Sequence, residues 1–139
     1  MRNLLLEKIY PITYSDDPDN SNHVKLAKYF LEAGIRFLQI RQGKSQDSFF
    51  YRQLLQIKTL CKPLQAQFLV NDRVDMALAT GANGVHLGQD DLPVSTARKL
   101  LGPQAIIGLS THNQQQFKAA QSEDINYVAI GPIFPTSTK

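Results

Sequence analysis

The sequence has one cysteine, no cluster of basic residues and no long hydrophobic run, and each absence excludes a class of protein. A single thiol, Cys61, cannot form an intrachain disulfide, and we expect it to be a buried or idle side chain rather than a nucleophile. The apolar start has only three consecutive leucines, Leu4–Leu6, before Glu7, which is too few for a signal peptide or a membrane span. We therefore expect a cytoplasmic protein without a membrane partner.

The net charge is mildly positive, and its distribution argues against a nucleic-acid partner. The 15 basic and 12 acidic residues give a formal charge of +3, and they are scattered along the chain. Such a balance suits an anionic small molecule. With 139 residues, of which 42% are hydrophobic, the chain is long enough to bury the core of one domain without disulfides or a structural metal.

Common catalytic and nucleotide-binding motifs are also missing. His23, His86 and His112 do not form a zinc-ligand pattern, and no glycine-rich nucleotide-binding motif occurs. His86 lies in an alternating, apolar segment, so we expect a hydrogen-bonded core histidine rather than a catalytic base. Ser110 lacks the flanking glycines of a nucleophile elbow and is better interpreted as a hydroxyl that binds a ligand.

Short apolar segments alternate with longer segments of helical spacing, a pattern typical of βα units and a parallel sheet. The expected strands are Ile9–Thr13, Phe37–Arg41, Phe68–Val70, Gly84–Leu87, Ile106–Leu109 and Tyr127–Ile130. The expected helices are 24–33, 48–60, 74–80, 94–101 and 113–122. A doubly wound open sheet and a (β/α)8 TIM barrel both fit. The barrel is favoured, with about six βα units present, because polar residues follow nearly every strand.

Several of these polar residues could bind phosphate. Gln39 and Arg41 are two positions apart on a strand and therefore point to the same side. Arg41 could clamp a phosphate or, equally, form a salt bridge at the barrel rim. At the end of the chain, hydroxyls and an ammonium group suited to phosphate follow the sixth strand closely. They are Thr136, Ser137, Thr138 and Lys139.

Two aspartates follow adjacent strands and could bind a metal ion. Asp72 and Asp91 each precede a helix, so each could also be a helix N-cap. Together they could hold magnesium, which usually binds one or two carboxylates and the phosphates of a substrate. Asp90 could replace Asp91, and the spacing does not decide between them.

Taken in order, five motifs resemble the thiamine phosphate synthase family. They are Gln39-Ile40-Arg41, the run from Phe68 to Asp72, the run from Gly84 to Pro93, Ile107-Gly108-Leu109-Ser110, and the run from Gly131 to Lys139. The resemblance implies a (β/α)8 barrel and a magnesium-dependent transferase. Such an enzyme joins hydroxymethylpyrimidine pyrophosphate to hydroxyethylthiazole phosphate and releases pyrophosphate.

The resemblance also implies roles for individual residues. Asp72 and Asp91 would hold the magnesium, and Thr136 to Thr138 would bind the thiazole phosphate. Residues implied to bind the pyrimidine pyrophosphate are Gln39, Arg41, Asn71, Ser110 and Lys139. The family usually has Gln-x-Arg-x-Lys, whereas here Gly43 occupies the lysine position, and Lys44 follows as the candidate for that role. No catalytic side chain is implied, because the thiazole nitrogen is the attacking nucleophile.

The resemblance leaves other readings open. The chain is expected to be a single, incomplete barrel domain over residues 1–139 that lacks the last two strands. Its first and sixth strands should then have unpaired edges, and turnover by these residues alone should be poor or absent. A homo-oligomer stays open. A thiazole tautomerase of the same family is the alternative enzyme, although the retained aspartates count against it, and a non-catalytic phosphate-binding remnant is the other alternative.

Overall fold

The computed structural model describes residues 9–15, 17, 22–43 and 46–134. Its strands are β1 (Ile12–Ser15), β2 (Phe37–Gln42), β3 (Gln67–Asn71), β4 (Gly84–Leu87), β5 (Ile106–Thr111) and β6 (Tyr127–Ile130). Its helices are α1 (His23–Glu32), α2 (Asp47–Cys61), the short 3-10 helix η1 (Lys62–Leu64), α3 (Val74–Thr80), α4 (Val94–Leu101) and α5 (Gln114–Ala120). The predicted alternation of strands and helices is therefore confirmed.

The first strand begins later than the sequence pattern predicts. The carbonyl of Pro11 accepts a hydrogen bond from the backbone N–H of Gln39 at 2.9 Å. Proline has no N–H to donate in return, so regular pairing starts only at Ile12. At the other end of the sheet, β5 extends to Thr111, two residues beyond the predicted end.

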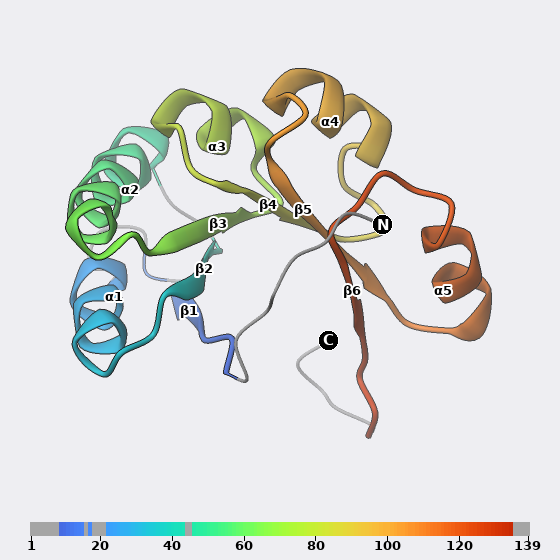
Figure 1. Ribbon diagram of the computed structural model, residues 1–139, viewed down its shortest axis with the longest axis horizontal. Coiled ribbons are helices and arrows are strands. Elements are labelled where there is room, and N and C mark those ends of the chain that lie inside the picture. Colours follow the sequence, from blue (N-terminus) through green and yellow to red (C-terminus); the bar gives the residue numbers. More distant parts are fainter. Residues whose placement is uncertain (1–8, 16, 18–21, 44–45, 135–139) are drawn as a thin grey trace.

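The sheet is entirely parallel, and its spatial order is the order of the sequence, β1-β2-β3-β4-β5-β6. Figure 1 shows helices α1 to α5 in an arc around the outside of the sheet. A doubly wound sheet would reverse its strand order and carry helices on both faces. Sequential order with helices on one face is the arrangement of a TIM barrel, which confirms the favoured architecture.

Alternate residues of the strands build two separate apolar clusters. Leu38 and Ile40 point outward and pack beneath the helices in the main core. Phe37 points inward and packs with Leu69, Ile106 and Tyr127, and Tyr10 lies against this inner cluster. Gln39 and Arg41 follow Phe37 on the inward side, so the sheet presents their polar groups next to the inner cluster.

The two outer strands each have one partner within the described part of the chain. β1 pairs only with β2, and β6 only with β5. Exposed apolar side chains follow from this, since Ile12 on β1 is 50% exposed and Ile130 on β6 is 59% exposed. The described residues include no helix that is both long and apolar enough to cross a membrane.

Candidate active site

A cavity of about 490 Å³ lies at the carboxyl ends of the strands. Its lining includes every predicted site residue that the structure describes: Gln39, Arg41, Asn71, Asp72, Asp91 and Ser110. These residues come from β2, β3, β5 and the loops that follow β3 and β4. The predicted ligands Lys44, Thr136, Ser137, Thr138 and Lys139 lie outside the described residues.

Neither of the two aspartates is a helix N-cap. Helix α3 begins after Arg73 and α4 begins after Pro93, and neither helix start has a side-chain cap. Asp72 has a backbone φ of 60°, a left-handed conformation that aspartate tolerates better than most residues. A carboxylate oxygen of Asp91 accepts a hydrogen bond from the backbone N–H of Gly88 at 2.6 Å. The capping alternative is therefore wrong for both residues.

The carboxyl groups of Asp72 and Asp91 lie within hydrogen-bonding reach of each other. Loss of water around the Asp72 carboxyl, together with its hydrogen bond to Asp91 and the charge of Asp91, raises the pKa of Asp72 to about 7. The guanidinium of Arg41 and a hydrogen bond from Asn71 act in the opposite direction on this pKa. A cation between the carboxylates would remove their repulsion, so this pair is a better candidate than one that includes Asp90.

The donor set fits magnesium better than a metal that needs a complete protein cage. Within the described ranges, no group of three or more histidine, cysteine, aspartate or glutamate side chains could hold a metal ion. Magnesium binds readily to one or two carboxylates when substrate phosphates complete its coordination. The residues present therefore fit a magnesium ion that binds together with a phosphorylated ligand.

Arg41 is exposed at the mouth of the cavity, and its guanidinium lies 5.5 Å from the centre of the Tyr14 ring. It has no salt bridge to any residue that the structure describes, and the rim salt bridge stays an alternative. Stacking on an aromatic ring orients a guanidinium but leaves its N–H groups available for an anion.

His86 is a hydrogen-bonded core residue, as the sequence predicts. Its Nδ1 lies 2.8 Å from the hydroxyl of Tyr127, and its Nε2 lies 2.8 Å from the hydroxyl of Ser110. The sequence pattern did not single out Tyr127 as a partner, and it did not indicate that His86 supports a predicted ligand. Cys61 is buried, and burial raises the pKa of its thiol to about 11, which excludes an activated thiolate.

Other polar residues at the cavity were not predicted as ligands. Gln89 donates a hydrogen bond from its side-chain amide to the carbonyl of Ser110 at 2.6 Å. The imidazole Nδ1 of His112 lies 2.6 Å from the carbonyl of Gly131, and Gln116 also faces the cavity. The sequence signal for Gln89 was its place two residues after the end of β4, because the predicted ligands also lie at or just after strand ends.

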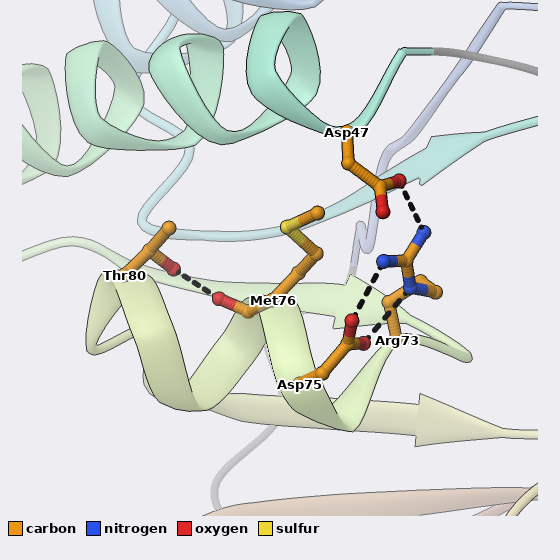
Figure 2. Close-up of polar contacts among 5 residues, drawn as sticks. All are labelled: Asp47, Arg73, Asp75, Met76 and Thr80. Atoms are coloured by element: carbon orange, nitrogen blue, oxygen red, sulfur yellow. Dashed lines mark hydrogen bonds and ion pairs between the residues drawn. The ribbon is translucent and has the colours of Figure 1, made fainter.

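Beside the aspartate pair, Arg73 joins two helix starts (Figure 2). Its guanidinium contacts Asp47 at the start of α2 at 2.9 Å, and it contacts Asp75 in the first turn of α3 at 2.6 and 2.8 Å. Hydrogen bonds from this guanidinium hold the pKa values of Asp47 and Asp75 below their usual range. The Arg73 bridge therefore ties the start of α2 to the segment that carries Asp72.

The parallel sheet defines a barrel-type α/β protein, and the paired carboxylates and the arginine at the same cavity form a candidate site whose chemistry suits a phosphorylated ligand and a divalent cation. Comparison with known proteins agrees with this class. The sequence profile of the family described as thiamine monophosphate synthase matches residues 9–139. The chain belongs to this family.

Individual relatives support the same assignment. The thiamine-phosphate synthase of Lawsonia intracellularis is 42% identical over 131 residues, which cover 94% of this chain and 60% of that protein. The one from Pelotomaculum thermopropionicum is 40% identical over 136 residues, and the match covers 98% of this chain and 62% of the relative. For the Nostoc punctiforme protein the identity is 43%, over 95% of this chain and 36% of the relative.

A solved structure shows the same fold. The thiamine phosphate pyrophosphorylase from Pyrococcus furiosus superposes with a TM-score of 0.79 at 31% sequence identity, over 91% of this chain and 61% of that one. The chain thus spans about 60% of the length of several relatives, and about a third of the longest named above.

Proposed function

We propose that this chain carries the magnesium and pyrimidine pyrophosphate site of a thiamine-phosphate synthase that works in the cytoplasm. The reaction joins hydroxymethylpyrimidine pyrophosphate to hydroxyethylthiazole phosphate and releases pyrophosphate. The observation that supports this proposal most strongly is the contact between Asp72 and Asp91 in a cavity that also contains Arg41. Two carboxylates held together need a cation or a shared proton, and a neighbouring arginine suits the anionic oxygens of a ligand that would share a cation.

The proposed chemistry requires stabilisation of charge rather than a side-chain nucleophile. The bond between the pyrimidine methylene and the pyrophosphate oxygen breaks, and the thiazole nitrogen forms the new bond to that methylene. Negative charge develops on the departing pyrophosphate, where Arg41 would neutralise part of it. Bound magnesium would supply further positive charge to the same oxygens. Asn71, Gln39 and Ser110 would hold the substrate by hydrogen bonds.

The matched pair Asp91→Asn and Asp90→Asn tests this site, because the two residues are neighbours and both line the cavity. Calorimetry with magnesium and pyrophosphate should show binding to the unchanged chain. Asp91→Asn should weaken the binding by at least about tenfold, because a charge-assisted contact is lost. Asp90→Asn should have little effect. Equal losses in the two variants, or binding that does not depend on magnesium, would contradict the proposed metal site.

An assay with both phosphorylated substrates tests the reaction itself. Formation of thiamine phosphate that disappears in Asp91→Asn would support the synthase. Magnesium-dependent pyrophosphate binding without product formation would limit the proposal to a binding role. Metal-independent conversion of a thiazole phosphate substrate, unaffected by Asp91→Asn, would instead support a tautomerase.

A further inference from the structure

A continuous chain of hydrogen bonds runs through the interior of the sheet beneath the cavity. It starts at the side-chain amide of Gln39, which donates to the hydroxyl of Tyr10 at 3.0 Å. The Tyr10 and Tyr127 hydroxyls are 2.8 Å apart, and the hydroxyl of Tyr127 is 2.8 Å from Nδ1 of His86. The other ring nitrogen of His86 reaches Ser110 at 2.8 Å. The chain thus joins two residues of the candidate site, Gln39 and Ser110, through three that do not serve as proposed ligands.

The chemistry at one end of this chain sets its direction. The amide nitrogen of Gln39 can only donate, so the oxygen of Tyr10 accepts. Either hydroxyl of the Tyr10–Tyr127 pair could be the donor, and each bond of the chain has one donor and one acceptor when Tyr10 gives its proton to Tyr127. Tyr127 in turn donates its proton to Nδ1 of His86. That nitrogen must then carry no proton, which places the proton on Nε2, where it is donated to the oxygen of Ser110. The hydroxyl proton of Ser110 therefore remains for an acceptor in the cavity.

Packing keeps the tyrosine in the middle of this chain in place. The ring of Tyr127 stacks on the imidazole of His86 at a centroid distance of 5.5 Å and meets the ring of Tyr10 edge-on at 5.8 Å. The Tyr127 ring also occupies the space next to Gly108, where an added Cβ would lie 2.1 Å from a ring carbon. Burial raises the pKa values of both tyrosines, so both hydroxyls keep the protons that the chain requires.

We propose that Tyr10, Tyr127 and His86 are positioning residues. The two tyrosines hold His86 in the Nε2–H tautomer, and His86 thereby makes Ser110 a hydrogen-bond donor toward the substrate. Only the role of Ser110 toward the substrate rests on the proposed function, because the tautomer of His86 exists without substrate. If the amide of Gln39 were rotated, its oxygen would accept from Tyr10 and every bond would reverse. His86 would then carry its proton on Nδ1, and Ser110 would present an acceptor. The two directions are therefore distinguishable at one nitrogen atom.

Nitrogen NMR of the histidine-labelled chain at neutral pH reads this atom directly. The sequence has three histidines, so the signals of His86 are assigned by their loss in His86→Gln. The expected result is a neutral ring with its proton on Nε2. Tyr127→Phe removes the donor to Nδ1 and should produce a mixture of tautomers, whereas Tyr51→Phe on the surface of α2 should leave the spectrum unchanged. A proton on Nδ1, or an unchanged spectrum in Tyr127→Phe, would overturn the proposal.

Binding of hydroxymethylpyrimidine pyrophosphate with magnesium tests the role of Ser110 as a hydrogen-bond donor to the substrate. Tyr127→Phe and Ser110→Ala should each weaken binding by about 3- to 10-fold, the effect of one hydrogen bond. If Tyr127 acts through Ser110, the double variant should bind no more weakly than Ser110→Ala alone. Additive losses would overturn the positioning role. Absence of binding by the unchanged chain would overturn the proposed function, while the tautomer measurement would still decide the direction of the hydrogen-bond chain.

Discussion

The raised pKa of Asp72 makes the stability of the metal-free chain depend on pH in a defined direction. The pKa rises from 3.8 to about 7 on folding, so the folded chain binds a proton more tightly than the unfolded chain does. The stabilising contribution of this carboxyl is therefore fully present below its unfolded pKa of 3.8 and is lost as the pH rises through about 7. We expect the metal-free chain to unfold more easily near pH 8.5 than near pH 5.

The size of the effect follows from the pKa and from the solvent contact of Asp72. For a fully buried carboxyl, this change in pKa would lower the free energy of unfolding by about 4 kcal/mol between acidic and alkaline pH, at about 1.36 kcal/mol per pKa unit. The Asp72 carboxyl is only partly withdrawn from water, because the residue is exposed at the cavity, and water therefore screens part of its repulsion with Asp91. We therefore expect about 1–2 kcal/mol, or about 3–10 °C in melting temperature for a chain of this length.

Thermal melts of the unchanged chain and of Asp72→Asn, with and without magnesium, measure this contribution. Asparagine adopts the left-handed backbone of residue 72 about as readily as aspartate, so the substitution adds little strain. Asp72→Asn should lack the additional loss of stability at alkaline pH. Magnesium should stabilise the unchanged chain near pH 8.5 much more than near pH 5, and it should stabilise Asp72→Asn weakly at both. Equal pH dependence in the two chains would refute the reasoning.

Two further predictions concern the scaffold of the site. Gly84→Ala should lower the free energy of unfolding by more than about 3 kcal/mol in denaturant melts. The reason is that the added Cβ would lie 1.8 Å from the carbonyl oxygen of Ile106 in the paired strand. A loss below about 1 kcal/mol would show that the strands can separate at this point. Asp47→Asn should speed amide hydrogen exchange in the first turn of α2, because it removes the contact with Arg73, whereas Asp75→Asn leaves that contact intact and should have less effect there. Equal exchange in these two variants would argue against a link through Arg73.

Local patterns in the sequence were sufficient for the elements and for one side of the site. The alternation within β2 correctly placed Gln39 and Arg41 on the same face, because neighbouring side chains of a strand point in opposite directions. The positions of polar residues after the strands also indicated which end of the sheet holds the cavity. The predicted start of β1 was wrong. Apolar composition extends back to Ile9, but Pro11 has no N–H to pair, so the strand begins at Ile12.

The role of the aspartates depended on information that local patterns do not contain. Asp72 and Asp91 both precede helices, which is the usual place of a capping residue, but in the structure both carboxyl groups contact each other instead. The left-handed backbone of Asp72 differs from the extended conformation that an N-cap residue usually has. The preference for Asp91 over Asp90 likewise depends on which carboxyl group lies next to that of Asp72.

The sequence by itself determined the order of strands and helices, the shared face of Gln39 and Arg41 on β2, and a specific resemblance to one family. Only the tertiary structure decided which of those groups meet. Tyr10 and Tyr127 are 117 positions apart, and their hydroxyls lie 2.8 Å from each other because the curved sheet brings both side chains into its interior. Periodicity reports the direction of a side chain relative to its own strand, whereas contacts between distant strands depend on register and curvature, which the whole set of packed elements fixes together.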